Sequence, residues 1–158
     1  MRGTTGRVPI LPRERDPRLI TVRRGGSLTD EHHQPHDSRP RVAIEAGRGW
    51  IRGDVRMTDS RRLAFEANAA GRDMPDPAKF AALSAGQAAA VPHVAAHDLG
   101  AAAYAIRAVV AGVPPSDAAQ ARAAERDWQR RQLPAAVREL VLDDQRRRSA
   151  ICWHVFDD

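Results

Sequence analysis

The sequence predicts an all-α protein, an alanine-rich bundle of four or five helices. Of its 158 residues, 29 are Ala, the strongest helix former, and only 4% are aromatic. Runs of β-branched residues are short, which argues against a sandwich or a barrel. A chain of this length is typical of one domain. We therefore expect a single helical domain at residues 16–156, preceded by a flexible basic tail at 1–15.

The N-terminal region predicts an arm rather than a helix. Residues 1–15 contain four Arg but no helical apolar period. Residues 16–26 carry a short apolar patch that could pack on the bundle as an extended arm. Residues 27–30 then have the form of a capping box, which signals a helix start. Pro35 ends that helix within a few residues.

Two helices follow in the first half of the chain. Asp37 or Ser38 is a suitable N-cap for the first, which Gly53 can end. Thr58 is a suitable N-cap for the second, at about 59–72. The spacing of apolar residues in both segments predicts one buried and one solvated helical face.

The most alanine-rich segment predicts a long central helix. It opens at Pro77, runs to about residue 111 and contains Pro92 near its middle. Proline lacks the backbone N–H that a helix interior needs, so Pro92 should kink the segment or divide it. We expect a Pro-kinked central helix, with small side chains that let its neighbours approach closely.

The C-terminal third predicts two more helices and an apolar end. The first, at about 117–132, has Ala121, Ala124 and Trp128 on its inner edge, with Arg131 or Gln132 one turn on. The second spans about 134–148. Apolar residues then alternate with others, as in a short docking strand or an extended tail. The alternating residues are Ile151, Trp153, Val155 and Phe156.

One histidine pair is the candidate metal site. On a helix, His93 and His97 would lie one turn apart and could share a metal ion. Asp98 follows His97 directly and would point about 100° round the helix, which makes it a poor third ligand. The alternative is that these histidines hydrogen-bond inside a tight helix packing. We therefore assign no metal site and keep His93 and His97 as candidates.

No other pattern predicts catalysis. Asp143 and Asp144 would diverge on a helix, and three following arginines can balance their charge. Cys152, the one cysteine, excludes an internal disulfide and resembles a packed thiol. Phosphate-binding glycine loops and nucleophile elbows are absent from the sequence. The sequence therefore predicts no catalytic residue and no cofactor.

Charge is distributed unevenly along the chain. The formal net charge is +5, from 24 Arg and one Lys against 20 acids. Residues 1–62 have a net charge of +6, and residues 63–158 have a net charge of −1. A basic arm can bind nucleic acid through its phosphates, or can simply be solvated. The lack of an 18-residue apolar stretch and of a secretory h-region predicts a cytoplasmic protein with no membrane contact.

Three stretches of the sequence resemble a known family. They are DPRLITVRRGGSLTD at 16–30, HVAAHDLGAAAYAIRA at 93–108, and ERDWQRRQLPAAVRELVLDDQRRRSAICWHVF at 125–156. These resemble the immunity-five-like family of small bacterial proteins, the partners of toxins in polymorphic toxin systems. The resemblance implies a non-enzymatic immunity protein that binds and neutralises a cognate toxin. The alternatives are a nucleic-acid-associated basic protein, such as a nuclease accessory, and a metal-binding bundle.

The resemblance also implies that one N-terminal helix is shortened. In the family, the capping signal leads into a long apolar helix, whereas this chain reaches Pro35 almost at once. Loss of that helix would expose apolar side chains on its neighbours, including Ile44, Trp50 and Trp128. We therefore expect marginal stability or a homodimer.

Overall fold

The computed structural model describes residues 37–158 and is helical throughout, with no strand in that range. This confirms the predicted all-α bundle. The predicted tail, arm and capping box lie outside the described residues. The elements are α1 (Arg39–Arg52), α2 (Met57–Ala70), α3 (Asp76–Ala90), α4 (His97–Ala111), α5 (Ala118–Gln132) and α6 (Ala135–Arg148), with the short 3-10 helices η2 (Pro115–Asp117) and η3 (Ala150–Cys152).

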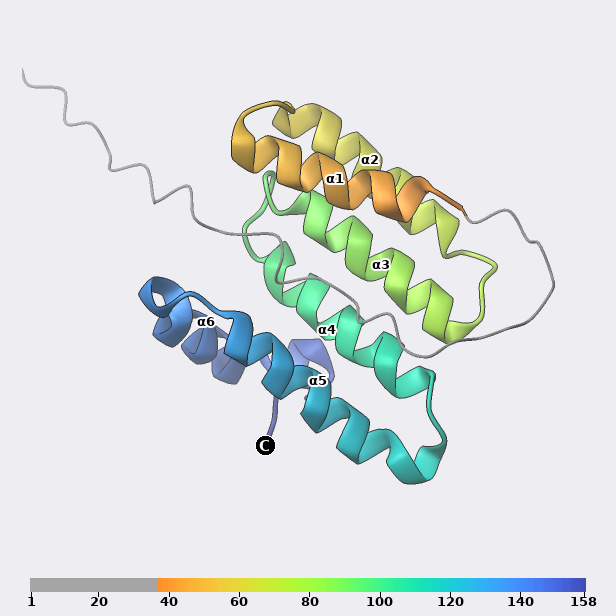
Figure 1. The fold of residues 1–158 in the computed structure, drawn as a ribbon, viewed down its shortest axis with the longest axis vertical. Coiled ribbons are helices and arrows are strands. Elements are labelled where there is room, and N and C mark those ends of the chain that lie inside the picture. The colour runs from red at the N-terminus through yellow and green to blue at the C-terminus, as the bar shows by residue number, and fades with distance from the viewer. Residues whose placement is uncertain (1–36) are drawn as a thin grey trace, which may run out of the picture.

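Helices α1 to α4 form the main body of the bundle (Figure 1). Helix α3 lies at its centre and contacts α1, α2 and α4. Helix α5 packs on α4, on the side away from α1 and α2, and α6 lies beyond it (Figure 1). Helices α1 to α4 are therefore closely packed, whereas α5 and α6 make fewer contacts with the rest of the bundle.

Pro92 divides the predicted central helix instead of kinking it. Helix α3 ends at Ala90 and α4 begins at His97. The turn between them reverses the chain, so that α3 and α4 pack side by side (Figure 1). The single kinked helix was wrong, and this division explains why six helices occur where four or five were expected.

Helix boundaries follow the predicted stop signals better than the predicted caps. Gly53 ends α1 in the left-handed conformation, with φ of 85°, as a C-terminal glycine does. Helix α2 begins at Met57, so Thr58 lies inside its first turn and does not cap it. Of the two residues predicted to cap α1, Ser38 makes no side-chain capping bond, whereas Asp37 Oδ1 accepts a hydrogen bond from the Arg39 backbone N–H, at 3.0 Å.

Small side chains allow the body helices to approach closely. The hydroxyl of Ser60 on α2 donates a hydrogen bond to the Ala89 carbonyl oxygen, at 2.7 Å. The Ser84 hydroxyl on α3 does the same to Ala101 on α4, at 2.8 Å. These bonds keep the buried hydroxyls satisfied between helices. The small-residue core comprises Ala43, Ala64, Ala67, Ala85 and Ala89.

A second core joins α4 to the C-terminal residues. Leu99, Ala103 and Ile106 pack against Cys152, Val155 and Phe156. The predicted strand or extended tail was wrong in form, because these residues lie in η3 and in tight turns. The alternation does not sort the side chains either, since Ile151 and Trp153 are exposed whereas Cys152, Val155 and Phe156 are buried.

Candidate functional site

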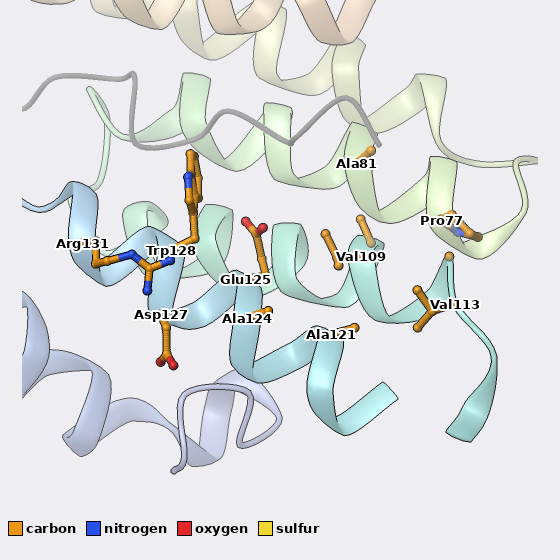
Figure 2. A pocket seen from close by; sticks show the side chains of 12 residues that line it. Pro77, Ala81, Val109, Val113, Ala121, Ala124, Glu125, Asp127, Trp128 and Arg131 are labelled. Atoms are coloured by element: carbon orange, nitrogen blue, oxygen red, sulfur yellow. The ribbon is translucent and has the colours of Figure 1, made fainter. Parts of the chain in front are cut away.

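A cleft of about 620 Å³ lies where α5 meets the α3–α4 pair. Apolar side chains supply most of its walls, and three charged residues line it (Figure 2). Its volume lies within the range of about 300–1,000 Å³ that is typical of ligand pockets. The lining residues are Pro77, Ala81, Ala108, Val109, Gly112, Val113, Ala121, Ala124, Glu125, Asp127, Trp128 and Arg131.

The sequence of α5 explains why a cleft remains. Ala121, Ala124 and Trp128 share the face of α5 that looks toward α4. The two alanines are too small to fill the space, and Trp128 forms a tall wall beside them (Figure 2). The sequence predicted these residues, with Arg131 or Gln132, as an inner edge. The structure places Arg131 along the cleft with the other three, whereas Gln132 does not line it.

Glu125 gives the cleft a buried carboxylate. Its side chain projects from α5 toward α4 (Figure 2), and the residue is only 5% exposed. Its Oε1 accepts a hydrogen bond from Gln129 Nε2, at 3.0 Å. Gln129 also donates to the Ala102 carbonyl oxygen, at 3.3 Å, while its own Oε1 is buried without a partner in the described region. The polar groups here are therefore incompletely satisfied.

The opposite face of α5 carries a ladder of three arginines that holds the C-terminal residues. We call Arg122, Arg126 and Arg130 the arginine ladder, since they recur every four residues. Arg122 Nη1 donates to the Asp157 carbonyl oxygen at 2.9 Å, and Arg130 Nη2 to that of Phe156 at 2.8 Å. Arg126 also donates to the Asp157 carbonyl oxygen. The ladder guanidiniums therefore bind the C-terminal residues and form no ion pair with Glu125 in the described part of the chain.

Of the other two charged residues that line the cleft, Asp127 forms an ion pair and Arg131 forms none in the described part of the chain. Asp127 Oδ1 lies 2.9 Å from Arg126 Nε, and Asp127 points away from Glu125 (Figure 2). Arg131 is exposed at the rim, and within residues 37–158 it makes no ion pair. Glu125 likewise has no cationic partner in that range.

An aromatic cluster on the far side of α4 fixes the C-terminal turns. The Arg107 guanidinium carbon lies 4.0 Å from the Phe80 ring centroid and 4.3 Å from that of Trp153. Tyr104 stands beside both rings, 6.2 Å from Phe80 and 5.1 Å from Trp153. A guanidinium over aromatic faces is a favourable cation–π arrangement. This cluster joins α3, α4 and the C-terminal turns.

The two candidate histidines do not share a helix. His93 is exposed in the turn after α3, and α4 begins only at His97. His93 and His97 therefore do not lie one turn apart on a helix, as the candidate metal site required. His97 Nδ1 instead lies 2.7 Å from Gln87 Oε1, as the hydrogen-bonding alternative predicted. The described coordinates contain no group of three or more His, Cys, Asp or Glu able to hold a metal ion.

The other two candidates have structural surroundings. Asp143 pairs with Arg147 at 2.6 Å, and Asp144 pairs with Arg148 at 2.8 Å. Cys152 is buried in the core beside α4, and burial raises the pKa of its thiol. A thiol whose pKa is raised is a poor nucleophile.

Sequence reasoning missed Glu125 and the arginine ladder. A charged residue on a polar helix normally indicates a solvated face, so nothing marked Glu125 as buried. The four-residue spacing of the ladder was visible, but its targets are backbone carbonyls that no side-chain pattern reveals.

Together, these features define an alanine-packed helical bundle with a cleft on one side. Residues 28–136, more than half of the chain, match the model of the family described as "Imm-5 like putative immunity protein". The chain belongs to this family of immunity proteins, as the resemblance implied. The match includes α1 to α5 and stops at the start of α6.

The other comparisons add no relative. No curated protein matches the chain, and no solved structure matches it. The helices in the described part are all too short or too polar to span a membrane.

Proposed function

We propose that this protein binds a cognate toxin in the cytoplasm and neutralises it without catalysis, using the face that carries the cleft. Membership of the immunity protein family is the observation that carries the proposal. An inhibitor of this kind needs a rigid complementary surface rather than a reactive centre.

The cleft face has the composition of a protein interface. Its centre is apolar, from Ala81, Val109 and Ala124, and its rim is polar. Trp128 and Arg131 stand at one end, and Trp and Arg are residue types over-represented among interface hot spots. Both are carried by α5, which the family match covers.

Co-expression with the toxin encoded beside this gene tests the proposal. We expect the wild-type protein to relieve growth arrest and to bind the purified toxin. Arg131→Ala removes an exposed rim residue, and Trp128→Ala removes a wall of the cleft. Loss of a hot spot costs about 2 kcal/mol or more, so each variant should bind about 30-fold more weakly.

The matched control is Trp50→Ala, because Trp50 is also partly exposed, at 38%, but lies on α1 at the far side of the bundle. We expect Trp50→Ala to protect cells as well as the wild type does. Circular dichroism and thermal unfolding of every variant separate lost binding from lost folding. Growth arrest that the wild-type protein leaves undiminished would reject the proposal.

The uneven charge favours a second candidate, association with nucleic acid as a nuclease accessory. The excess lies mostly in residues 1–24, where seven Arg face two acids, whereas residues 37–158 carry 18 basic and 16 acidic side chains. Binding would then depend on the arm and fall steeply with salt. Fluorescence anisotropy with duplex DNA and with RNA, between 50 and 200 mM salt, measures it. A salt-independent signal, or none at low salt, would reject this candidate.

The third candidate, a metal-binding bundle, is tested by elemental analysis. Protein purified without chelators should contain stoichiometric zinc or iron if His93 and His97 contribute to a site. Substitution of both by Gln should then remove the metal. Metal content below one-tenth of stoichiometric would reject it.

A further inference from the structure

Glu125 has a buried carboxyl group without a cationic partner in the described part of the chain. It is 5% exposed, and a neutral amide, Gln129 Nε2, is its one hydrogen-bond donor there. The nearest arginines on its own helix belong to the ladder and are bound to the C-terminal carbonyls. Burying a carboxylate in this way is costly unless a cation pairs with it.

The cleft around Glu125 has the shape and the walls for a long basic side chain. Its volume of about 620 Å³ exceeds that of one side chain, so part of a peptide also fits. Val109 and Ala124 offer apolar surface to the methylene stem of Lys or Arg. Trp128 offers an aromatic face on which a guanidinium can stack.

The rim adds a second requirement. Arg131 is exposed at the rim and makes no ion pair within residues 37–158. Its charge is positive, like that of the Lys or Arg side chain that the cleft would receive. A partner that presents only positive charge would be repelled at the rim. A segment with a basic anchor followed by a carboxylate or a free carbonyl oxygen would satisfy Glu125 and Arg131 together.

We propose that the cleft receives a Lys or Arg side chain of the toxin, with Glu125 as its counter-ion and Trp128 as its stacking surface. The choice of partner rests on the proposed function. The cation site itself does not, and the two are tested by different measurements.

Butylguanidinium, a fragment of Arg, probes the cation site in the full-length protein. The Trp128 indole N–H resonance, assigned with Trp128→Phe, reports binding. We expect a saturable shift at millimolar concentration and at least a tenfold weaker affinity in Glu125→Gln. Butylurea, which has the same shape without charge, should give no saturable shift. An equal response to butylurea, or an unchanged response in Glu125→Gln, would overturn the cation site.

The chain's own arm is the competing occupant, since it also combines arginines with apolar residues. To test whether the arm occupies the cleft, we replace Arg18, Arg23 and Arg24 by Gln in the full-length chain. We expect the Trp128 resonance and the affinity for butylguanidinium to stay unchanged. If the resonance moves and butylguanidinium binds only in this variant, the arm fills the cleft and the proposal is overturned.

Binding to the purified toxin tests the partner. Glu125→Gln should weaken toxin binding at least tenfold, whereas Glu139→Gln, an exposed residue on α6, should leave it within twofold. Each variant removes one negative charge, so the comparison isolates position. Toxin binding that Glu125→Gln leaves intact would overturn this inference but not the proposed function. Failure of the wild type to bind toxin, with butylguanidinium still bound, would overturn the function but not the cation site.

Discussion

The Arg107 guanidinium on α4 lies 4.3 Å from the ring centroid of Trp153 in the C-terminal turns. Trp153 adopts a positive φ of 55°, a conformation that costs a residue other than glycine about 1–3 kcal/mol. Stacking on the cation helps to offset that cost. Because Phe80 on α3 lies on the same guanidinium, one side chain joins three segments.

Arg107→Gln should destabilise the fold by about 1–2 kcal/mol, the range for a partly desolvated cation–π pair. Arg61→Gln is the control, because Arg61 lies 5.6 Å from the exposed ring of Phe65. It should cost about 0.5 kcal/mol or less. Urea unfolding followed by circular dichroism compares them. Equal losses in the two variants would contradict a special role for Arg107.

Two glycines should respond in opposite directions to substitution by Ala. At Gly86 on α3, a Cβ would lie 2.1 Å from Asn68 Oδ1 and 3.0 Å from the Ala64 carbonyl oxygen. Gly86→Ala should therefore destabilise by about 1–3 kcal/mol despite its better helix propensity. At Gly47 on α1, the nearest contact would be an ordinary 3.5 Å. Gly47→Ala should stabilise by up to about 1 kcal/mol.

Thermal unfolding of both variants against the wild type measures this pair. The two changes are chemically the same, so their difference reports the space at each site. Equal shifts of melting temperature would show that helix propensity alone governs the response and that the α2–α3 approach is less tight than described.

Cys152 should react slowly with thiol reagents while the protein is folded. It is buried, and burial raises the pKa of its thiol, so little reactive thiolate is present. We expect Ellman's reagent at pH 8 to react at least about tenfold faster in urea than in buffer. Absorbance at 412 nm gives both rates. A folded-state rate equal to the unfolded one would place the thiol at the surface.

The C-terminal turns should loosen in acid. The Ser149 hydroxyl donates to the Asp157 carboxylate, and this bond, with a further one from His154, holds the pKa of Asp157 below its ordinary value of 3.8. A carboxyl whose pKa is lowered by folding stabilises the fold above that ordinary value. The contribution is lost as the pH falls through the lower, folded pKa.

Asp157→Asn should therefore lower the melting temperature at pH 7, and its difference from the wild type should shrink below about pH 4. Ser149→Ala removes the donor and should give the same pH profile. Differential scanning calorimetry from pH 2 to pH 7 follows both. A difference that stays constant over this range would contradict the ion-linked contact.

Marginal stability or self-association remains expected, but from a smaller exposed face than the sequence suggested. Of the three residues named for it, Ile44 packs beside the small-residue core and Trp128 lines the cleft. Trp50 is 38% exposed. Sedimentation across a concentration series, combined with thermal unfolding, should show either dimers or a monomer of low melting temperature. A monomer at every concentration, unfolding cooperatively above about 65 °C, would contradict this.

The fold was predictable where local chemistry decides it. The high alanine content predicted helices. Gly53 and Pro92 predicted helix ends, and α1 ends at Gly53 while α3 ends just before Pro92. Whether Pro92 kinks or divides a helix depends on the packing gained by folding α4 back on α3, which no local pattern contains. The one-turn spacing assumed for His93 and His97 was wrong for the same reason, because it required an unbroken helix.

The cleft was only half predictable. Periodicity identified the face of α5 that carries Ala121, Ala124 and Trp128, but it does not tell whether a neighbour fills that face. Burial of Glu125 was hidden because it depends on the distance between α4 and α5. That distance is set by tertiary contacts, including the hold of the arginine ladder on the C-terminal residues.

The ladder has a consequence for how this protein tolerates mutation. Arg122, Arg126 and Arg130 bind main-chain oxygens, which every amino acid supplies. Arg126 and Arg130 also pair with the Asp158 carboxylate. Substitutions at an exposed position such as Ile151 should leave those main-chain oxygens in place. A change in any of the three arginines removes a donor whatever the held segment's sequence. The main-chain anchoring of the C-terminal residues is thus encoded in α5, whereas the side chains of Phe156 and Asp157 are constrained by their own packing and hydrogen bonds.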